Sequence, residues 1–250
     1  MYFYNISKNI FRPAYLKFFK NKPGLGWFKH DLKQFKELNN GKRFLNDDIG
    51  IFPCLNDKTE TTHFDAHYVY HPAWAARIVK HIAPDIHVDI SSTLHFCSIL
   101  SAFVNTDFYD YRPANLILSN LACKSADLTK LHFASDSINC LSCMHTIEHI
   151  GLGRYGDPID PEGDIKAINE LKRVCAKNGH LLIAVPVGRK SIQFNAHRIY
   201  DPFAVVSYMD GFRLENFALV DDSGAFMNEA SLEMAAQQRY GCGCYWFIKV

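Results

Sequence analysis

The stretch that decides the fold begins IHVDISSTLHF, residues 86–96. A short apolar run containing Asp89 is followed by a turn of small residues, and apolar residues then continue at helical spacing from Leu94 to Phe103. Three more strands are predicted downstream, at residues 107–111, roughly 115–122 and 137–144. Strands that alternate with helices in this way predict a parallel, doubly wound sheet, whose ligands bind beyond the carboxyl ends of the strands.

The flanking segments extend this α/β pattern. Pro72 is expected to open a helix before the first strand. The glycine-rich residues 151–158 predict an ordered loop over the strand ends, and the helix after that loop is expected to end at Asn178-Gly179 with a left-handed cap. Further apolar strands are predicted at residues 181–185, 217–220 and 244–250.

The composition is that of an ordinary globular protein, with 250 residues, 48% hydrophobic content and a net charge of +1. The near-neutral charge argues against a dedicated nucleic-acid binder, so we expect no nucleic-acid partner. Eight cysteines are scattered along the chain, several in apolar strands, as expected for buried free thiols in a reducing compartment. No apolar run approaches the roughly 18 residues of a membrane span, and the first residues lack the features of a secretory signal. These features favour a cytoplasmic protein.

Residues 1–43 differ in charge from the rest of the chain. They hold ten lysines and arginines but two acids, a net of +8, so the remaining 207 residues carry −7. One interpretation of this basic, aromatic segment is a surface that meets an anionic partner, such as the inner face of a membrane or a phosphorylated glycan carrier. The other is a helical cap whose aromatic residues pack on the core while its lysines stay solvated. We assign residues 1–62 to an N-terminal extension and residues 63–250 to the main domain.

The turn after the first strand distinguishes between two nucleotide cofactors. A dinucleotide such as NAD needs a glycine-rich turn, which lets a helix N-terminus approach the pyrophosphate. The turn at residues 89–93 contains no glycine. S-adenosylmethionine (SAM) carries no phosphate and is held by carboxylates instead. Asp110 after the second strand can bind the ribose hydroxyls, Asp127 after the third strand can bind the adenine amino group, and Asp89 can meet the methionine ammonium.

Four segments resemble the motifs of class I SAM-dependent methyltransferases. Residues 125–128 (SADL) and 131–138 (LHFASDSI) resemble the acid and the segment that precede the fourth strand in that class. Residues 141–150 (LSCMHTIEHI) resemble the fourth strand and its turn, and residues 177–182 (KNGHLL) resemble the helix-to-strand corner that follows. The resemblance covers about residues 64–190.

A longer match is more specific. Residues 148–158 (EHIGLGRYGDP), together with His67-Tyr68 and residues 74–77 (WAAR), are similar to a poorly characterised methyltransferase-like family associated with bacterial surface-polysaccharide genes. Two positions depart from the class I pattern. Ser91 stands where that class has glycine after the acid, and Ile138-Asn139 replaces a Phe-Asp pair. A serine at this turn narrows the approach of the methionyl part of SAM.

The resemblance implies a Rossmann-like class I methyltransferase fold, with helices on both faces of a mostly parallel seven-stranded sheet and a reversed strand near the C-terminus. It implies SAM as the cofactor, and O-methylation of a sugar or another cell-surface glycan precursor as the reaction. The residues expected to bind SAM are Asp89, Ser91, Ser92, Asp110, Ala126, Asp127, Leu128 and His145. The candidate catalytic residues are His149, His145, Glu148 and Tyr155, and the candidate acceptor-binding residues are His67, Tyr68, Arg154 and His197. Histidine is the favoured general base for a hydroxyl acceptor at neutral pH, and His149 is the first candidate.

No metal site is predicted from the sequence. Cys140 and Cys143 have the spacing of paired ligands ahead of His145 and His149, but residues three apart on a strand point to opposite faces. Cys242-x-Cys244 does share a face, yet the sequence offers it no evident partner pair.

Two other functions stay open at this level. Ser91 is compatible with a methyltransferase-like protein that has lost catalysis and serves as a binding or scaffold subunit. The same fold could also belong to an enzyme of another reaction class that modifies nucleotide sugars, because this architecture hosts many chemistries.

Overall fold

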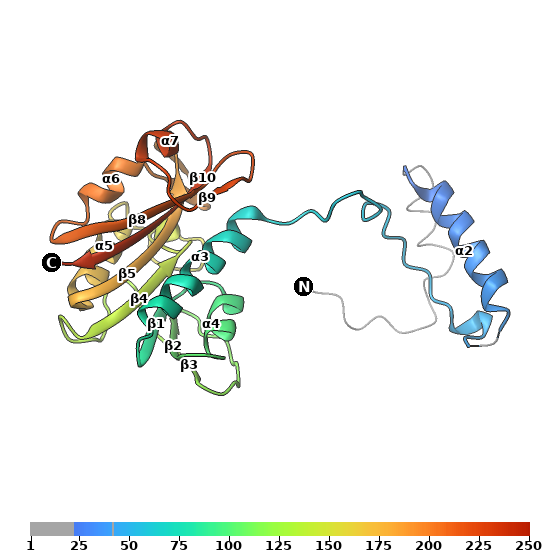
Figure 1. Ribbon diagram of the computed structural model, residues 1–250, viewed down its shortest axis with the longest axis horizontal. Helices are drawn as coiled ribbons and strands as arrows, with labels where there is room; N and C mark the ends of the chain where they lie inside the picture. Colours follow the sequence, from blue (N-terminus) through green and yellow to red (C-terminus); the bar gives the residue numbers. More distant parts are fainter. Residues whose placement is uncertain (1–22, 42) are drawn as a thin grey trace. The chain divides into compact units, whose positions relative to one another are not determined.

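The computed structural model describes residues 23–41 and 43–250, and the chain divides into two compact units, Met1–Phe64 and Asp65–Val250. The described part of the first unit contains the helix α2 and a short 3-10 helix, η1 (Figure 1). The membrane contact predicted for residues 1–43 falls largely on residues 1–22 and 42, which lie outside the described residues.

The helix α2 spans Leu25–Asn39 and lies between two residues in the left-handed conformation, Gly24 and Asn40. The 3-10 helix η1 covers Asn46–Asp48. Lys58 Nζ lies 4.6 Å from the centroid of the Trp27 ring and so ties the segment after η1 to α2 by a cation–π contact. Within the described residues, no helix is both long and apolar enough to cross a membrane.

The second unit is built on one eight-stranded sheet in the order β3-β2-β1-β4-β5-β10-β8-β9. Its strands are β1 (Ile86–Ile90), β2 (Asn105–Asp110), β3 (Leu121–Ser125), β4 (Ile138–Met144), β5 (Cys175–Val187), β8 (Phe212–Val220), β9 (Phe226–Met227) and β10 (Gly241–Lys249). The first five strands of the sheet order pair in parallel. The strand β10 runs antiparallel to both β5 and β8. The predicted mixed α/β fold and mostly parallel sheet are therefore confirmed, whereas the predicted number of seven strands is wrong because β9 adds an eighth at the edge.

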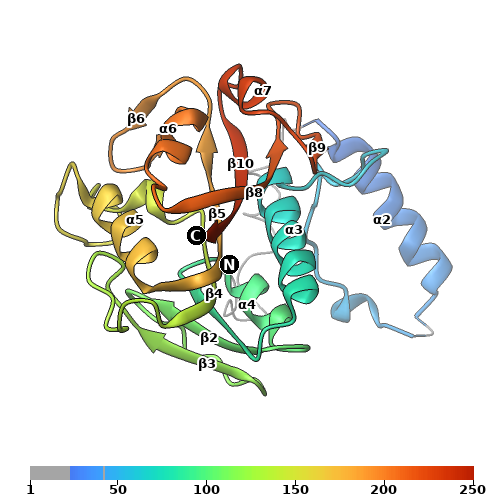
Figure 2. The ribbon, with the colours of Figure 1, turned by 60° about the vertical axis from the view of Figure 1, so that its left-hand side comes forward.

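Two hydrophobic cores cover the two faces of this sheet, as the alternation of side chains along a strand requires. On one face, α3 (Ala66–Ile82) and α4 (Leu94–Leu100) pack on a core that includes Leu182 and Ala184 of β5. On the other face, α5 (Gly163–Val174), α6 (Pro202–Ser207) and α7 (Leu232–Ala236) pack on a core that includes the neighbouring β5 residues Leu181 and Ile183. Figure 2 shows α3 and α5 on opposite sides of the strands. A small hairpin, β6 (Ser191–Gln193) with β7 (His197–Ile199), completes the unit.

Two predicted helix ends are wrong. The helix expected to begin at Pro72 begins six residues earlier, at Ala66, because Asp65 caps it by accepting a hydrogen bond from the backbone N–H of Tyr68. The helix α5 ends at Val174 instead of Asn178. Asn178 does take the left-handed conformation, with φ of 61°, but it does so inside β5, where the pairing with β4 shifts register.

The third predicted strand is also misplaced. The sequence pattern predicts it at residues 115–122, whereas β3 covers Leu121–Ser125. The corrected position brings the end of β3 level with Asp110, the last residue of β2, because Ser125 is paired with Asp110.

Candidate cofactor and active site

A cavity of about 370 Å³ lies beyond the carboxyl ends of the parallel strands. One wall consists of residues that directly follow β1, β2 and β3, and the opposite wall consists of the turn after β4 and the loop that leads into α5. The cavity is thus at the edge where a doubly wound sheet binds its ligands.

The cavity gathers about half of the predicted site residues. Those that line it are Ser91, Asp110, Ala126, Asp127, Leu128, His145, His149 and Tyr155. The predicted residues that do not line it are Asp89, Ser92, Glu148, His67, Tyr68, Arg154 and His197. Glu148 and Arg154 contact the cavity residues His145 and His149, respectively. His67, Tyr68 and His197 belong to a group of aromatic side chains near His145, which is described below.

Each of the two strand-end acids in the cavity is fixed by a turn of its own. Asp110 Oδ1 accepts a hydrogen bond of 2.7 Å from the backbone N–H of Arg112. Asp127 Oδ1 accepts from both the backbone N–H and the hydroxyl of Thr129, at 2.8 and 2.7 Å. These turn bonds use Oδ1 in both residues. The buried Leu128 supplies an apolar surface to the same cavity.

Ser91 occupies the position that the class I pattern gives to glycine, and its backbone explains that preference. Its φ is 55°, in the left-handed region that glycine adopts most readily. The serine is held there because its backbone N–H and its hydroxyl both donate to Tyr109 O, at 2.7 and 3.2 Å. The Ser91 carbonyl in turn accepts a 2.7 Å hydrogen bond from Thr146 Oγ1. The turn therefore keeps its shape without glycine. Asp110, Asp127 and the apolar Leu128, which line the same cavity as Ser91, fit a nucleoside such as that of SAM.

Asp89 and Ser92 lie under the cavity and stabilise the sheet instead. Asp89 is fully buried, and its Oδ1 accepts a hydrogen bond from Ser142 Oγ, which is also 2.8 Å from His87 Nε2. Within the described residues, Asp89 Oδ2 has no hydrogen-bond partner. Ser92 Oγ accepts from the backbone N–H of Met144 at 3.0 Å. Their contacts join β1 to β4 and so fix the two strands whose ends form the cavity.

The buried carboxyl of Asp89 makes the stability of the protein depend on pH. Burial raises the pKa of Asp89 from 3.8 to about 7, against the lowering effect of its hydrogen bond from Ser142. The folded state therefore holds a proton that the unfolded chain has released, so this stabilisation is complete below pH 3.8 and is lost as the pH rises through 7. We expect Asp89→Asn to show no such loss up to pH 8, whereas the wild type loses about 3 kcal/mol from this group between pH 5 and 8. Urea unfolding of both proteins between pH 5 and 8 measures this difference, and parallel pH profiles would contradict it.

His145 links the cavity to β10. The residue follows β4 in the left-handed conformation, with φ of 53°. Its Nδ1 lies 2.8 Å from Glu148 Oε1, and its Nε2 lies 3.2 Å from Cys242 Sγ. Although burial opposes charge on His145, the attraction of Cys242 and Glu148 raises its pKa to about 10. Burial raises the pKa of the Cys242 thiol well above its usual value.

Several aromatic side chains surround His145. Their ring centroids lie 5.5 Å (His67), 5.3 Å (Tyr68) and 4.9 Å (His71) from that of His145. Burial, with the nearby charge of His145, lowers the pKa of His67 to about 4 and lowers that of His71 well below its usual value. His197 joins the same group through Tyr240, whose ring stacks on His67. Three of the four acceptor-binding residues predicted from the sequence, His67, Tyr68 and His197, thus lie together beside the cavity, whereas Arg154 contacts His149 and Tyr155.

His149 has a hydrogen bond that fixes its tautomer. Its Nδ1 lies 2.5 Å from the carbonyl oxygen of Ala196, which can only accept, so Nδ1 carries the proton and Nε2 has the free electron pair. Arg154 reaches the same ring, with its guanidinium 3.5 Å from Nε2. Burial lowers the pKa of His149, and Arg154 adds to this effect while Glu148 opposes it. His149 is therefore neutral at physiological pH and able to take a proton.

Several cavity residues were not predicted from the sequence, among them Arg112, Asp157 and Lys166. Arg112 and the predicted Arg154 lie 5.0 and 5.1 Å from the centroid of the Tyr155 ring, so this ring meets two guanidinium groups. Asp157 accepts hydrogen bonds from the backbone N–H groups of Gly151, Gly153 and Tyr155. Lys166 pairs with Asp160 at 2.6 Å. The signal for Asp157 was present in the sequence, since an Asp-Pro pair ends the glycine-rich loop.

A family model described as "Caenorhabditis protein of unknown function, DUF268" matches residues 115–240. The chain belongs to the DUF268 family. The matched region runs from the segment before β3 to the residue before β10, and so includes Asp127, His149 and the loop with Asp157. Asp110, His67 and Cys242 lie outside it. A search of curated protein sequences found no match to the chain.

Solved structures with the same fold include several named enzymes. The N-methyltransferase NodS from Bradyrhizobium japonicum WM9, in complex with S-adenosyl-L-homocysteine, has a TM-score of 0.50 and 11% identity, covering 78% of this chain and 92% of its own. The [4+2]-cyclase SpnF also has a TM-score of 0.50 and 11% identity, covering 71% and 80%. The MccD protein has a TM-score of 0.50 and 13% identity, covering 71% and 96%. At these identities the similarity shows the fold alone, which is that of SAM-dependent methyltransferases. The link to surface-polysaccharide genes finds no support among these matches.

Proposed function

We propose that this DUF268 chain is a SAM-dependent methyltransferase that methylates an oxygen of a sugar or another cell-surface glycan precursor. The observation that carries the proposal is the joint position of Asp110, Asp127 and His149 in one cavity at the carboxyl edge of the sheet. Two carboxylates and a neutral histidine within one cavity match the needs of a nucleoside cofactor and a hydroxyl acceptor.

The strand ends of β2 and β3 would hold the nucleoside half of SAM. Asp110 Oδ2 would accept hydrogen bonds from the ribose hydroxyls, and Asp127 Oδ2 would accept one from the adenine amino group. The buried Leu128 lines the same cavity and would pack on the adenine ring. Bound SAM supplies an activated methyl group on a sulfonium ion.

The opposite wall of the cavity would orient the acceptor. His149 Nε2 would take the proton of the hydroxyl as its oxygen attacks the methyl group, and the Nδ1 bond to Ala196 keeps the ring in the tautomer that can do so. Much of the rate would come from holding the hydroxyl oxygen in line with the methyl group. Tyr155, Asp157 and Lys166 add polar groups along the same wall, which suits an acceptor with several hydroxyls.

Replacement of Asp110 tests the cofactor assignment without knowledge of the acceptor. We expect Asp110→Asn to weaken binding of S-adenosylhomocysteine about 30-fold, because hydrogen bonds to a charged group contribute about 2 kcal/mol. Isothermal titration calorimetry measures this affinity, with NAD as a ligand that should not bind. The matched control is Asp107→Asn, on the same strand, whose carboxylate pairs with Lys124 at 3.0 Å outside the cavity.

The control should bind S-adenosylhomocysteine as tightly as the wild type. Equal affinity of the Asp110 variant and the wild type would remove Asp110 from the cofactor site. Binding of NAD, or no binding of S-adenosylhomocysteine by the folded wild type, would refute the proposed function.

A further inference from the structure

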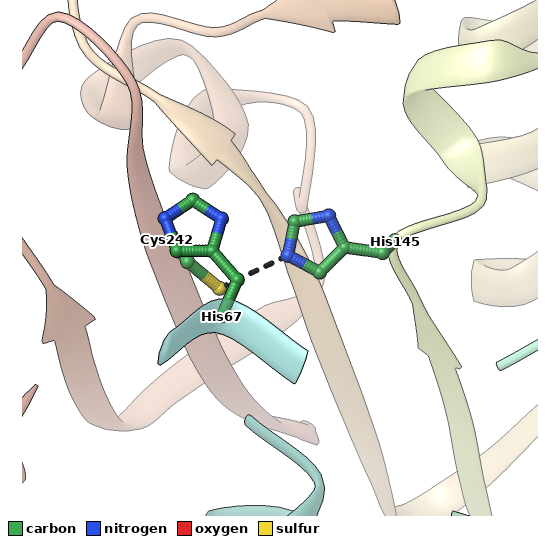
Figure 3. A group of neighbouring side chains, drawn as sticks. All are labelled: His67, His145 and Cys242. Carbon is green, nitrogen blue, oxygen red and sulfur yellow. Dashed lines mark hydrogen bonds between the residues drawn. The ribbon is translucent and has the colours of Figure 1, made fainter. Parts of the chain in front are cut away.

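We propose that His67, His145 and Cys242 form a binding site for one zinc ion. The three residues come from distant parts of the sequence: the first turn of α3, the turn after β4, and the start of β10. Their ligand atoms, two imidazole nitrogens and one sulfur, all lie within 4.8 Å of one another. Figure 3 shows His145 directed at the sulfur of Cys242, with His67 entering from α3. This site goes beyond the proposed methyl transfer and does not depend on it.

The donor set and its spacing suit zinc. Imidazole nitrogen and cysteine sulfur are the ligands that zinc prefers, at about 2.0 and 2.3 Å, so neighbouring donors of a tetrahedral site lie about 3.3–3.8 Å apart. His145 Nε2 and Cys242 Sγ are already 3.2 Å apart. His67 is partly exposed, so a change of its side-chain rotamer can bring its nitrogen the remaining distance.

Glu148 gives His145 the support that zinc-binding histidines have. A carboxylate accepts the Nδ1–H of the imidazole at 2.8 Å, which directs Nε2 at the sulfur. Metal-binding histidines almost always donate their other N–H to a carboxylate or carbonyl in this way, and the bond fixes both ring orientation and basicity. Glu148 is 1% exposed and lies outside the cavity lining. The proposed zinc site thus explains why Glu148 is buried next to His145: it orients a metal ligand.

Two unsatisfied polar atoms lie in the same cluster. Within the described residues, His71 Nε2 and Glu148 Oε2 have no hydrogen-bond partner, although both side chains are almost fully buried. Buried polar atoms without partners are rare in folded proteins, and neither of these two atoms belongs to one of the three proposed ligands. The ring of His71 lies 4.9 Å from that of His145, so one of these atoms belongs to the residue packed directly against the proposed ligand.

The site is accessible from two sides. His145 lines the cavity proposed for SAM, and His67 lines a second cavity of about 370 Å³ that also includes Asp221 and Asp222. The second cavity offers a route for the ion. Three protein ligands leave a fourth position for water or a hydroxyl oxygen, which is the arrangement that catalytic zinc sites keep.

A second buried pair in the protein provides the contrast that the test needs. His87 Nδ1 and Cys140 Sγ are also 3.2 Å apart, and both residues are fully buried. Within the described residues, no third histidine, cysteine or carboxylate joins that pair at ligand distance. The His87–Cys140 pair therefore shows that a buried histidine–cysteine hydrogen bond can form without a third donor. The third donor, His67, distinguishes the His145 group from this pair.

Metal titration of the purified full chain tests the proposal. The protein, freed of metal with a chelator, should bind one Zn²⁺ per chain, and Co²⁺ in its place should show the charge-transfer absorption of a thiolate ligand. Cys242→Ala should lose that absorption and bind zinc at least 100-fold more weakly. Cys140→Ala, which removes an equally buried thiol, should keep both properties. Circular dichroism establishes that each variant is folded.

Two further variants keep the test decisive if Cys242→Ala does not fold. His67→Ala changes a partly exposed residue and should also weaken zinc binding at least 100-fold. Glu148→Gln should weaken it 10- to 100-fold, as expected for a residue that orients a ligand. The proposal fails if the folded wild type binds no zinc, if its cobalt form shows no thiolate absorption, or if the folded His67 variant binds zinc as tightly as the wild type and the Cys140 control do.

Discussion

Replacing Gly151 with alanine is expected to destabilise the second unit by about 2–5 kcal/mol and to abolish binding of S-adenosylhomocysteine. Gly151 has φ of 80°, where a side chain costs about 1–2 kcal/mol. A Cβ at this position would also lie 2.0 Å from the carbonyl oxygen of Asp160, and relief of such overpacking costs about 1–3 kcal/mol. Gly151 and Asp160 both line the cavity, so moving the two backbones apart changes its wall. Urea unfolding and calorimetric titration measure the two effects.

Gly156→Ala is the matched control for this variant. Gly156 lies in the same loop with φ of 82°, but a Cβ there would have no heavy atom within 4 Å. We expect this control to cost about 1 kcal/mol, from the left-handed conformation alone, and to keep its affinity for S-adenosylhomocysteine. Equal losses in the two variants would show that backbone conformation, and not the approach of Asp160, makes glycine necessary at position 151.

Replacing His149 with alanine is expected to lower the rate of methyl transfer by about 100- to 10,000-fold, the usual contribution of a general base. Affinity for S-adenosylhomocysteine should change by less than about threefold, because the residue acts on the acceptor. Transfer of a labelled methyl group from SAM to a panel of nucleotide sugars measures the rate. For the wild type, the rate should fall only at a pH below 6.5, because burial and Arg154 lower the pKa of His149.

His95→Ala serves as the control for the His149 variant. His95 is exposed on α4 and does not line the cavity, so its loss should leave the rate unchanged. If His149→Ala retains the wild-type rate, the histidine has a structural role, in which its bond to Ala196 joins the turn after β4 to the β6–β7 hairpin. An equal loss of rate and of cofactor affinity would instead place His149 at the cofactor.

Local sequence patterns predicted the first strand and the start of the helix after it well, whereas the third strand was misplaced. The strand Ile86–Ile90 and the start of α4 at Leu94 agree with the structure to the residue, because each combines a clear apolar pattern with a turn or cap at its boundary. The errors arise where tertiary packing overrides a local signal. Pro72 is tolerated inside α3 because Trp74, Ala75, Ile78 and Val79, on the helix face after it, are buried in the core on the sheet. The Asn178-Gly179 turn bends a strand instead of ending a helix.

The candidate site shows the same division. Asp110 and Asp127 were predicted to share an edge because parallel strands place their carboxyl ends together, and the structure has both in one cavity. The sequence could not indicate that the Asp89 side chain is buried against Ser142 of β4, since the direction of a side chain depends on the register of its strand. The sequence also could not predict that His67 and Cys242 lie close together, because their proximity depends on the position of β10 between β5 and β8.

The antiparallel insertion of β10 also has a consequence for the order in which the protein can fold during synthesis. Because β10 runs opposite to β5, its first residues, Gly241 and Cys242, pair with Val187 and Pro186 at the ligand-binding edge. Until residues 241–249 have left the ribosome, β5 and β8 have no strand between them, and both expose unpaired backbone groups that favour aggregation. The parallel half of the sheet can form early from nearby segments. The histidine–cysteine cluster, in contrast, is completed only when the last strand closes the sheet.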